Sequence, residues 1–382
     1  MAIRMKRSAR VLLLLVTALS LAGEAFAGQF GKAAYFHAGQ VPRRVLGAQF
    51  TQSGNMDLVL ADWLDNEVVI LLGNGNGTFQ APRKFFAPSP LGIATGDFNE
   101  DGNLDVAVVE TNGTGDGQLA IFLGDGKGNL KFATAYPIGI ESVDVAVADF
   151  DGDGHLDVAV TDFGFEGAPG DVIVFFGNGK GKLRRVARFK TLHGPAGIAA
   201  GDLNGDHRPD LAVTLEGSGS VAVFLNDGTG HFQKPVIYGA GDCCGPVDVK
   251  IADLRNNGDQ DLVIANDNAG MVVLLNKGDG TFGKPAVYTP FFQNWQPPEA
   301  CTVADFNLDG KLDVACAPAG NNAYFFYGNG KGQFGSGIEI KNAINHQGGF
   351  SIASGDFNND NAPDLAIPIE EYGKVAILLN TK

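Results

Sequence analysis

Residues 97–105 read Asp97-Phe98-Asn99-Glu100-Asp101-Gly102-Asn103-Leu104-Asp105, and close copies of this stretch return along the whole chain. Strong copies lie at 149–157, 202–210, 305–313 and 356–364, and weaker copies lie at 49–57 and 253–261. The seven copies begin 48 to 53 residues apart. A repeat of this length indicates that each copy belongs to one structural unit of a repeat architecture.

A glycine-rich turn follows each copy after an apolar segment. The first one reads Leu71-Leu72-Gly73-Asn74-Gly75-Asn76-Gly77-Thr78-Phe79. Equivalent stretches lie at 122–130, 175–183, 224–232, 274–282 and 326–334, and the seventh stops short at the end of the chain, 378–382. Glycines at these places suit turns that need positive φ.

Each period has room for four short strands, which in the second period are expected at about 91–96, 105–110, 118–123 and 131–136. The third strand is apolar at successive positions, as in Val172-Ile173-Val174-Phe175-Phe176, which indicates a sheet covered on both faces. No convincing amphipathic helix follows residue 27. The sequence therefore predicts an all-β fold, a seven-bladed β-propeller of four-stranded antiparallel blades.

The two ends of the chain predict how the ring closes. Residues 30–35 resemble residues 282–288, which form the fourth strand of a repeat, whereas the last repeat lacks that strand. We expect the N-terminal strand to complete the last blade and so protect its exposed edge.

The first 27 residues have the pattern of a secretory signal peptide. Basic residues at 4–10 precede an apolar run at 11–22, and Ala25-Phe26-Ala27 is a small-x-small cleavage site. The run is shorter than the roughly 20 residues of a membrane span, so an uncleaved anchor is the weaker alternative. We expect a single propeller domain at 28–382, exported to the periplasm or outside the cell.

Composition and charge reduce the number of functional classes to consider. The chain is 45% hydrophobic and 19% charged, which is typical of a globular protein. Its net charge of −15 would repel the phosphates of a nucleic acid, so nucleic-acid binding is disfavoured.

Five of the repeated loops have oxygen donors at positions 1, 3, 5 and 9. Calcium takes six to eight oxygen ligands, and the carbonyl at position 7 can add one. An EF-hand would need a glutamate at position 12 and flanking helices, but apolar strands follow these loops. We therefore expect about five Ca²⁺ sites in β-hairpin loops, with ordinary Asp/Gly turns as the alternative. The ligand sets are Asp97, Asn99, Asp101, Asp105; Asp149, Asp151, Asp153, Asp157; Asp202, Asn204, Asp206, Asp210; Asp305, Asn307, Asp309, Asp313; and Asp356, Asn358, Asp360, Asp364.

Two loops depart from this pattern. The fifth has Arg255 at position 3, and we expect its guanidinium to replace the metal charge by pairing with the aspartates. The first has Gln49, Thr51 and Ser53 in place of acidic donors and is expected to be metal-free. At position 6, His207 and Asn361 replace glycine, and both residue types tolerate positive φ. His155 and His207 as transition-metal ligands are a minor alternative, because the loops are rich in oxygen.

The pairing of Asp-Phe-Asn-x-Asp-Gly-x-x-Asp with Phe-Leu-Gly-Asn-Gly-x-Gly-x-Phe resembles the FG-GAP/VCBS repeat family over nearly all of 28–382. That family includes the seven-bladed propeller of integrin α-chains and many exported bacterial proteins. The resemblance implies calcium in hairpin loops on one face of the propeller. It also implies adhesion or ligand binding, often through the opposite face.

The loops expected on that opposite face carry aromatic residues, namely Trp63, Phe163, Trp295 and Tyr372. Acidic and amide residues such as Asp162, Glu216, Asp267 and Glu370 lie in the same loops. Aromatic surfaces beside carboxylates and amides suit a sugar or a protein partner. The alternative is that these rings only fill the loops or the mouth of the ring.

Four cysteines allow three pairings. Cys301 and Cys316 flank the sixth loop, and export would permit a disulfide across that hairpin. Cys243 and Cys244 are adjacent and form either a vicinal disulfide or a redox or metal site.

No catalytic motif is present, and the six histidines are scattered without ligand spacing. The sequence thus favours an exported, calcium-binding, monomeric binding or adhesion module over an enzyme. A propeller enzyme acting on polysaccharide, either a lyase or a hydrolase, and a scaffold of an envelope complex are the alternatives.

Overall fold

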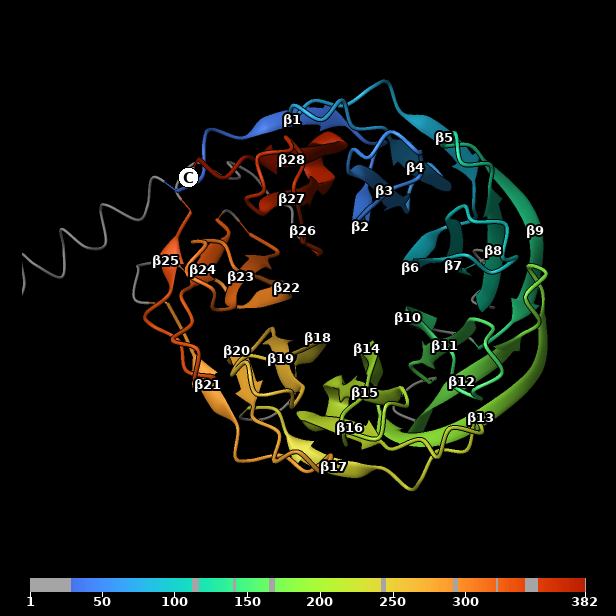
Figure 1. Cartoon of the computed structure of the whole chain (residues 1–382), viewed down its shortest axis with the longest axis vertical. Helices are drawn as coiled ribbons and strands as arrows, with labels where there is room; N and C mark the ends of the chain where they lie inside the picture. Colours follow the sequence, from blue (N-terminus) through green and yellow to red (C-terminus); the bar gives the residue numbers. More distant parts are fainter. Residues whose placement is uncertain are drawn as a thin grey trace, which may run out of the picture.

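The computed structural model describes residues 29–111, 117–139, 142–164, 169–241, 245–290, 295–320, 322–340 and 350–381. They form seven four-stranded antiparallel sheets arranged as blades around a central axis (Figure 1). The predicted seven-bladed propeller is confirmed. In the described chain the only helical segments are two short 3₁₀ turns, η1 (Glu216–Ser218) and η2 (Glu370–Tyr372), and none of its helices has the length and apolar character needed to span a membrane.

The strands follow the repeats in order, from the axis outward. Blade 1 has β2 (Pro42–Ala48), β3 (Asp57–Asp62), β4 (Glu67–Leu71) and β5 (Arg83–Phe86); blade 2 has β6 (Pro90–Gly96), β7 (Asp105–Thr111), β8 (Gly117–Gly124) and β9 (Leu130–Pro137); blade 3 has β10 (Ser142–Ala148), β11 (Asp157–Asp162), β12 (Pro169–Gly177) and β13 (Leu183–His193); blade 4 has β14 (Pro195–Gly201), β15 (Asp210–Leu215), β16 (Ser220–Phe224) and β17 (Val236–Gly239). Blade 5 has β18 (Pro246–Ala252), β19 (Asp261–Asn266), β20 (Gly270–Leu274) and β21 (Ala286–Tyr288); blade 6 has β22 (Pro298–Ala304), β23 (Asp313–Pro318), β24 (Tyr324–Phe326) and β25 (Ile338–Glu339); blade 7 has β26 (Ala353–Gly355), β27 (Asp364–Ile369), β28 (Lys374–Leu378) and β1 (Ala34–His37). In blade 2 the predicted boundaries agree with these to within one residue.

The hydrophobic core lies between the blades. Each of seven clusters of buried side chains joins two neighbouring sheets, and one of them joins the first repeat to the last through Val45, Leu58, Phe357 and Ala366. The second and third strands of most blades are buried almost throughout, because both of their faces meet a neighbouring sheet. This explains why these strands lack the alternating pattern of a half-exposed sheet.

The ring closes as predicted. Strand β1 pairs antiparallel with β28 and forms the outer edge of blade 7, where Figure 1 shows it beside the C-terminal strands. Upstream of β1, the Gly31 N–H donates to the Leu379 carbonyl at 2.8 Å. The Phe30 ring packs edge-on against Phe306 and Phe325 of blade 6, with ring centroids 5.9 and 6.2 Å apart. The N-terminal segment therefore fastens blade 7 and contacts blade 6.

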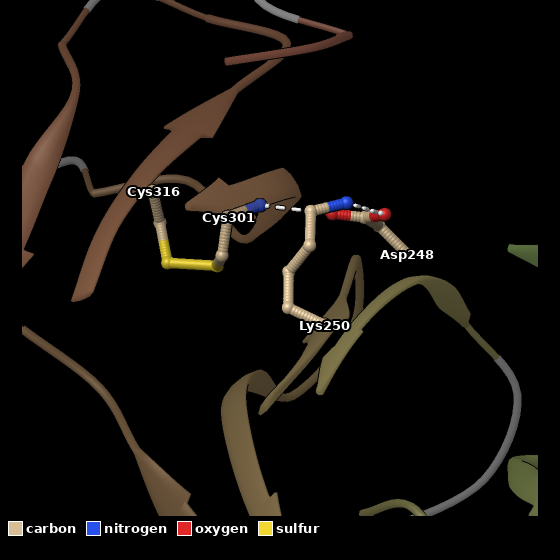
Figure 2. Close-up of a disulfide and its surroundings, with 4 residues drawn as sticks. All are labelled: Asp248, Lys250, Cys301 and Cys316. Atoms are coloured by element: carbon tan, nitrogen blue, oxygen red, sulfur yellow. Dashed lines mark hydrogen bonds and ion pairs between the residues drawn. A yellow bond between two sulfur atoms is a disulfide. The ribbon is translucent and has the colours of Figure 1, made fainter. Parts of the chain in front are cut away.

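A disulfide joins Cys301 and Cys316, which face each other across β22 and β23, as the sequence allowed (Figure 2). The Cys301 N–H donates to Asp248 Oδ2 of blade 5 at 3.1 Å, and Lys250 Nζ donates to Asp248 Oδ1 at 2.6 Å. A buried carboxylate thus links the innermost strands of two blades beside the disulfide. Cys243 and Cys244 lie outside the described residues.

Replacement of Phe30 by Ala tests the closure. The variant should lose roughly 3 kcal/mol of unfolding free energy, because the ring leaves a cavity between blades 6 and 7. Urea unfolding followed by circular dichroism measures this loss. Phe86 is the matched control, since 75% of its surface is exposed on the outer strand β5, and its replacement by Ala should cost less than about 0.5 kcal/mol. Equal effects of the two substitutions would contradict the closure.

Candidate metal loops and the opposite face

The repeated loops join the first strand of each blade to the second, so all seven lie on one face of the propeller. The aspartate at position 9 of the loop is fully buried in every repeat. In blade 2, Asp105 Oδ2 accepts the Phe98 N–H at 2.9 Å, and Asp105 Oδ1 accepts the Gly124 N–H at 2.8 Å. The same carboxylate therefore holds the loop and the glycine turn that follows the third strand.

The aspartate at position 1 is fixed in a similar way. Asp97 accepts the N–H groups of Asp101 at 3.1 Å and Gly102 at 2.7 Å. The bond from position 6 recurs in all five complete loops and in the fifth repeat. Position 6 has positive φ throughout, including 65° at His207 and 66° at Asn361, as the sequence predicted.

The sequence did not predict the backbone conformation at position 4 of the loop. This position also has positive φ, with 58° at Leu308 and 59° at Glu100, although neither residue type favours that region. The loop geometry imposes this conformation, and the residue types gave no signal of it.

Burial and the charges of neighbouring carboxylates raise the pKa of the position 9 carboxyl in all five complete loops. The pKa of the position 9 carboxyl is raised to about 6 in Asp105, Asp157, Asp210 and Asp313, and to about 7 in Asp364. Desolvation is the largest cause, and the aspartates at positions 5 and 1 add to it, except at Asp157, where those at positions 3 and 1 do so. A cation placed among the three carboxylates would reverse this effect.

In the third loop three carboxylates converge, and the Arg184 guanidinium pairs with Asp153 and lies 3.6 Å from Asp151. Carboxylate oxygens of Asp149, Asp151 and Asp153 lie within 4.8 Å of one another. Asp151 Oδ1 is buried and has no hydrogen-bond partner in the described chain. Oxygen donors that converge with one of them unsatisfied suit a hard divalent cation.

Arg255 occupies the corresponding place in the fifth loop. Its Nη2 lies 2.8 Å from Asp261 Oδ1 and 3.4 Å from Asp259 Oδ2, and its Nε lies 3.1 Å from Asp261 Oδ2. Nη2 also donates to the Asn276 carbonyl at 2.7 Å. The predicted pairing is confirmed, and a side-chain cation stands where the other loops bring their carboxylates together.

The first loop lacks the acidic donors. Thr51 and Ser53 share a hydrogen bond of 2.9 Å, while Asp57 keeps both backbone bonds of a position 9 aspartate. The pKa of Asp57 is raised by burial, with no loop carboxylate among the causes.

On the opposite face, a cavity of about 190 Å³ opens at the mouth of the central channel. Arg43 lies at its edge, with its guanidinium carbon 4.5 Å from the centre of the Trp63 ring and 5.6 Å from that of Phe350. Arg43 Nε also pairs with Glu370 Oε1 at 2.9 Å. Trp63 thus serves as a platform for Arg43, an arrangement the sequence did not reveal.

The other predicted aromatic residues are spread around this face. Phe163 lines the cavity, half-buried. Trp295 is half-buried and Tyr372 is 45% exposed, but neither is among the described residues that line the cavity. The structure therefore brings Phe163 to the cavity and Trp63 beneath Arg43 at its edge, whereas Trp295 and Tyr372 are not part of the described lining.

Glu299 was missed by sequence reasoning. It lies on β22, lines the cavity with Glu216, and has a pKa raised to about 7 by burial and by the nearby charges of Asp267 and Glu216. Equivalent second positions of the inner strands are apolar in Leu91, Val143 and Val247. The sequence did contain a signal for this site, because a charged residue stands at a position that is mostly apolar in the other repeats.

A sequence profile of FG-GAP-like repeats matches residues 50–108, 97–160, 161–213, 208–264, 253–316 and 305–367. No curated protein matches the chain in sequence.

Among solved structures, the chain is similar to an Agrocybe aegerita lectin described as recognising non-reducing terminal N-acetylglucosamine, with 23% identity, a TM-score of 0.53, and coverage of 81% of this chain and 80% of the lectin. It is similar to BBS1N, solved in complex with ARL6DN, with 12% identity, a TM-score of 0.62, and coverage of 92% and 97%. It is also similar to Chaetomium thermophilum Raptor, with 12% identity, a TM-score of 0.57, and coverage of 93% of this chain and 30% of Raptor. At these identities the likeness concerns the fold alone.

Replacement of Arg255 by Asn should create a metal loop. The variant has oxygen donors at positions 1, 3, 5 and 9, so it should bind one more calcium ion than the wild type. In chelator its melting temperature should fall, because Asp261 loses its cation. Equilibrium dialysis and thermal melting give the two readouts.

Arg208 is the matched control for this substitution. It lies at position 7 of the fourth loop, its side chain is 51% exposed, and its Nη1 is 3.9 Å from Asp206 Oδ2. Replacement of Arg208 by Asn should change neither the stoichiometry nor the melting temperature in chelator. An Arg255→Asn variant that binds no additional ion would contradict the assigned role of the guanidinium.

Proposed function

The chain belongs to the FG-GAP-like repeat family, and from this premise we propose that it is an exported, calcium-stabilised binding module. Its ligand, a carbohydrate or a protein, docks on the face opposite the calcium loops. The observation that carries this proposal is the division of the two faces. Seven copies of one loop occupy the first face, whereas the second has a cavity lined by residues that differ from blade to blade.

Calcium is proposed for the five complete loops. The converging carboxylates, the raised pKa of each position 9 carboxyl, and the guanidinium in the fifth loop support a cation at this place. The side chains at positions 1, 3, 5 and 9 would hold the ion. Its contribution there is charge neutralisation and rigidity of the loop.

Export is proposed from the pattern of residues 1–27, which lie outside the described residues. The disulfide between Cys301 and Cys316 supports an oxidising compartment, where such bonds persist. A monomer in the periplasm or outside the cell is the simplest state for this proposal.

Ligand binding on the opposite face is supported by the chemistry of its cavity. Phe163 and several aliphatic side chains provide apolar contact area, and Arg44, Glu216 and Glu299 provide polar groups. A mostly apolar cavity with a few converging polar groups is typical of small-molecule sites. The lectin among the similar structures shares the fold and is in keeping with a carbohydrate ligand.

A polysaccharide-cleaving enzyme is the second candidate. Glu299 favours it, since a carboxyl with a pKa of about 7 beside the carboxylate of Glu216 has the properties of a general acid. Release of reducing or unsaturated ends from a polysaccharide by the wild type, and no release by Glu299→Gln, would replace the binding proposal with this one. A scaffold of an envelope complex would appear instead as a protein partner without a glycan ligand.

Removal of calcium should destabilise the protein. A site filled at 100 times its Kd adds about 2.7 kcal/mol, so loss of several ions should lower Tm by roughly 10 °C or more. Differential scanning calorimetry in millimolar calcium and in chelator measures the change. The double variant Asp149→Asn, Asp153→Asn should show a smaller difference. A Tm that chelator leaves unchanged after thorough metal removal would refute structural calcium.

Binding of a glycan is tested on a polysaccharide and glycan array in millimolar calcium. Selective binding should weaken at least tenfold in Phe163→Ala, because a cavity wall is lost. It should persist in Phe86→Ala, whose ring lies on the outer rim. A blank array would reject the carbohydrate ligand and direct the search to protein partners of the same face.

A further inference from the structure

The mouth cavity has an unequal distribution of charge. Glu216, on the turn η1 of blade 4, and Glu299, on β22 of blade 6, line it on one side. Arg43 and Arg44, on β2 of blade 1, line it on the other. Asp267 lies close enough to Glu216 and Glu299 to act on both charges.

The basic side of the cavity is already partly neutralised. Arg43 pairs with Glu370 at 2.9 Å and lies over the Trp63 ring. Arg44 faces the carboxylate of Asp144, which lines a second, inner cavity of about 250 Å³ that Arg44 also borders. Arg43 therefore has a carboxylate of its own, and the charge of Arg44 is shared between Asp144 and Glu299.

The acidic side is not neutralised in the same way. Within the described chain, the carboxylates of Glu216 and Glu299 have no hydrogen-bond partner and no cation within 4.0 Å. Both are half-buried. Two partly desolvated carboxylates on one wall, with Asp267 adding repulsion, are stabilised most by a group that brings positive charge and several hydrogen-bond donors.

We propose that this cavity binds the free ammonium group of an amino sugar, held between Glu216 and Glu299. This deepens the proposed function and rests on it. A neutral sugar would leave the repulsion between the carboxylates in place, and an anionic sugar would increase it. An ammonium has three hydrogen-bond donors, so a single group can donate to more than one carboxylate of the wall.

The remaining walls suit a sugar ring. Phe163, Leu91, Val143 and Val247 provide apolar surface for its C–H groups. Arg44 provides N–H donors for ring or hydroxyl oxygens on the side away from the glutamates. The volume of about 190 Å³ gives room for one monosaccharide unit and excludes a folded element of a protein.

The test compares three ligands that differ at one position: glucosamine, N-acetylglucosamine and glucose. Isothermal titration calorimetry with the exported wild-type protein in calcium should give binding of glucosamine, and at least tenfold weaker binding of the other two. The proposal is overturned if N-acetylglucosamine or glucose binds as well as glucosamine, or if glucosamine does not bind. Glycan-array binding that persists in those cases would leave the proposed function intact.

Glutamine variants distinguish the effect of carboxylate charge on binding from the effect of side-chain shape. Glu299→Gln and Glu216→Gln retain side-chain size and remove one charge each, so each should weaken glucosamine binding at least tenfold. Glu371→Gln is the control, because that carboxylate lies on the same face outside the cavity lining and its loss should leave binding unchanged. Unchanged melting curves show that the variants fold.

Two outcomes of the variant series would overturn the proposal. The first is glucosamine binding that both glutamine variants retain. The second is tighter binding of lysine amide than of glucosamine, which would show that the cavity recognises an amine of a peptide rather than of a sugar.

Discussion

The buried aspartate at position 9 is the constraint on which the rest of the structure depends. It is present in all seven repeats, including the two that lack a full set of metal donors, and it is fully buried in each. In most repeats its two oxygens accept one N–H from the loop and one from the glycine turn. Because an unsatisfied carboxylate is costly in the interior, these backbone bonds set the path of the hairpin.

The same loop also connects one blade to the next. The last glycine of the turn donates its N–H to the carbonyl at position 2 of the loop in the preceding blade, as in Gly181 to Phe98 at 2.8 Å and Gly230 to Phe150 at 2.9 Å. Gly77 does so to Phe357 across the junction between the last and first repeats. A side chain at these glycines would strain the positive φ, so one repeated stretch specifies both the hairpin and the ring.

The regular parts of this structure could be predicted because they recur. A period of about 50 residues predicted the blades, the unmatched first strand predicted the closure, and Arg255 in a column of oxygen donors predicted its ion pairs. The surroundings of Glu299 depend on how the inner strands of several blades converge at the channel mouth, and no local sequence pattern encodes the distances between blades. Arg43 and Trp63 both belong to blade 1, but their stack depends on side-chain positions that the repeat pattern does not specify. Leu308 escaped prediction for a related reason, because the hydrogen bonds of its loop, and not its own preference, impose positive φ.

The loops of blades 1 and 5, which lack the full set of donors, show which part of the loop the blade itself requires. Blade 1 keeps the Asp57 hydrogen bonds with no acidic neighbours in its loop, and blade 5 has a guanidinium where the other loops bring their carboxylates together. A blade can therefore form around position 9 without the other acidic donors, and the additional carboxylates are what a bound cation would stabilise. With calcium bound as proposed, the acidic loops would make that face responsive to the ion, while the cavity at the opposite mouth is built from side chains of the inner strands and the turns at that end. Calcium would thus affect a ligand there through the rigidity of the blades, and the charges of Glu216 and Glu299 would act on the ligand directly.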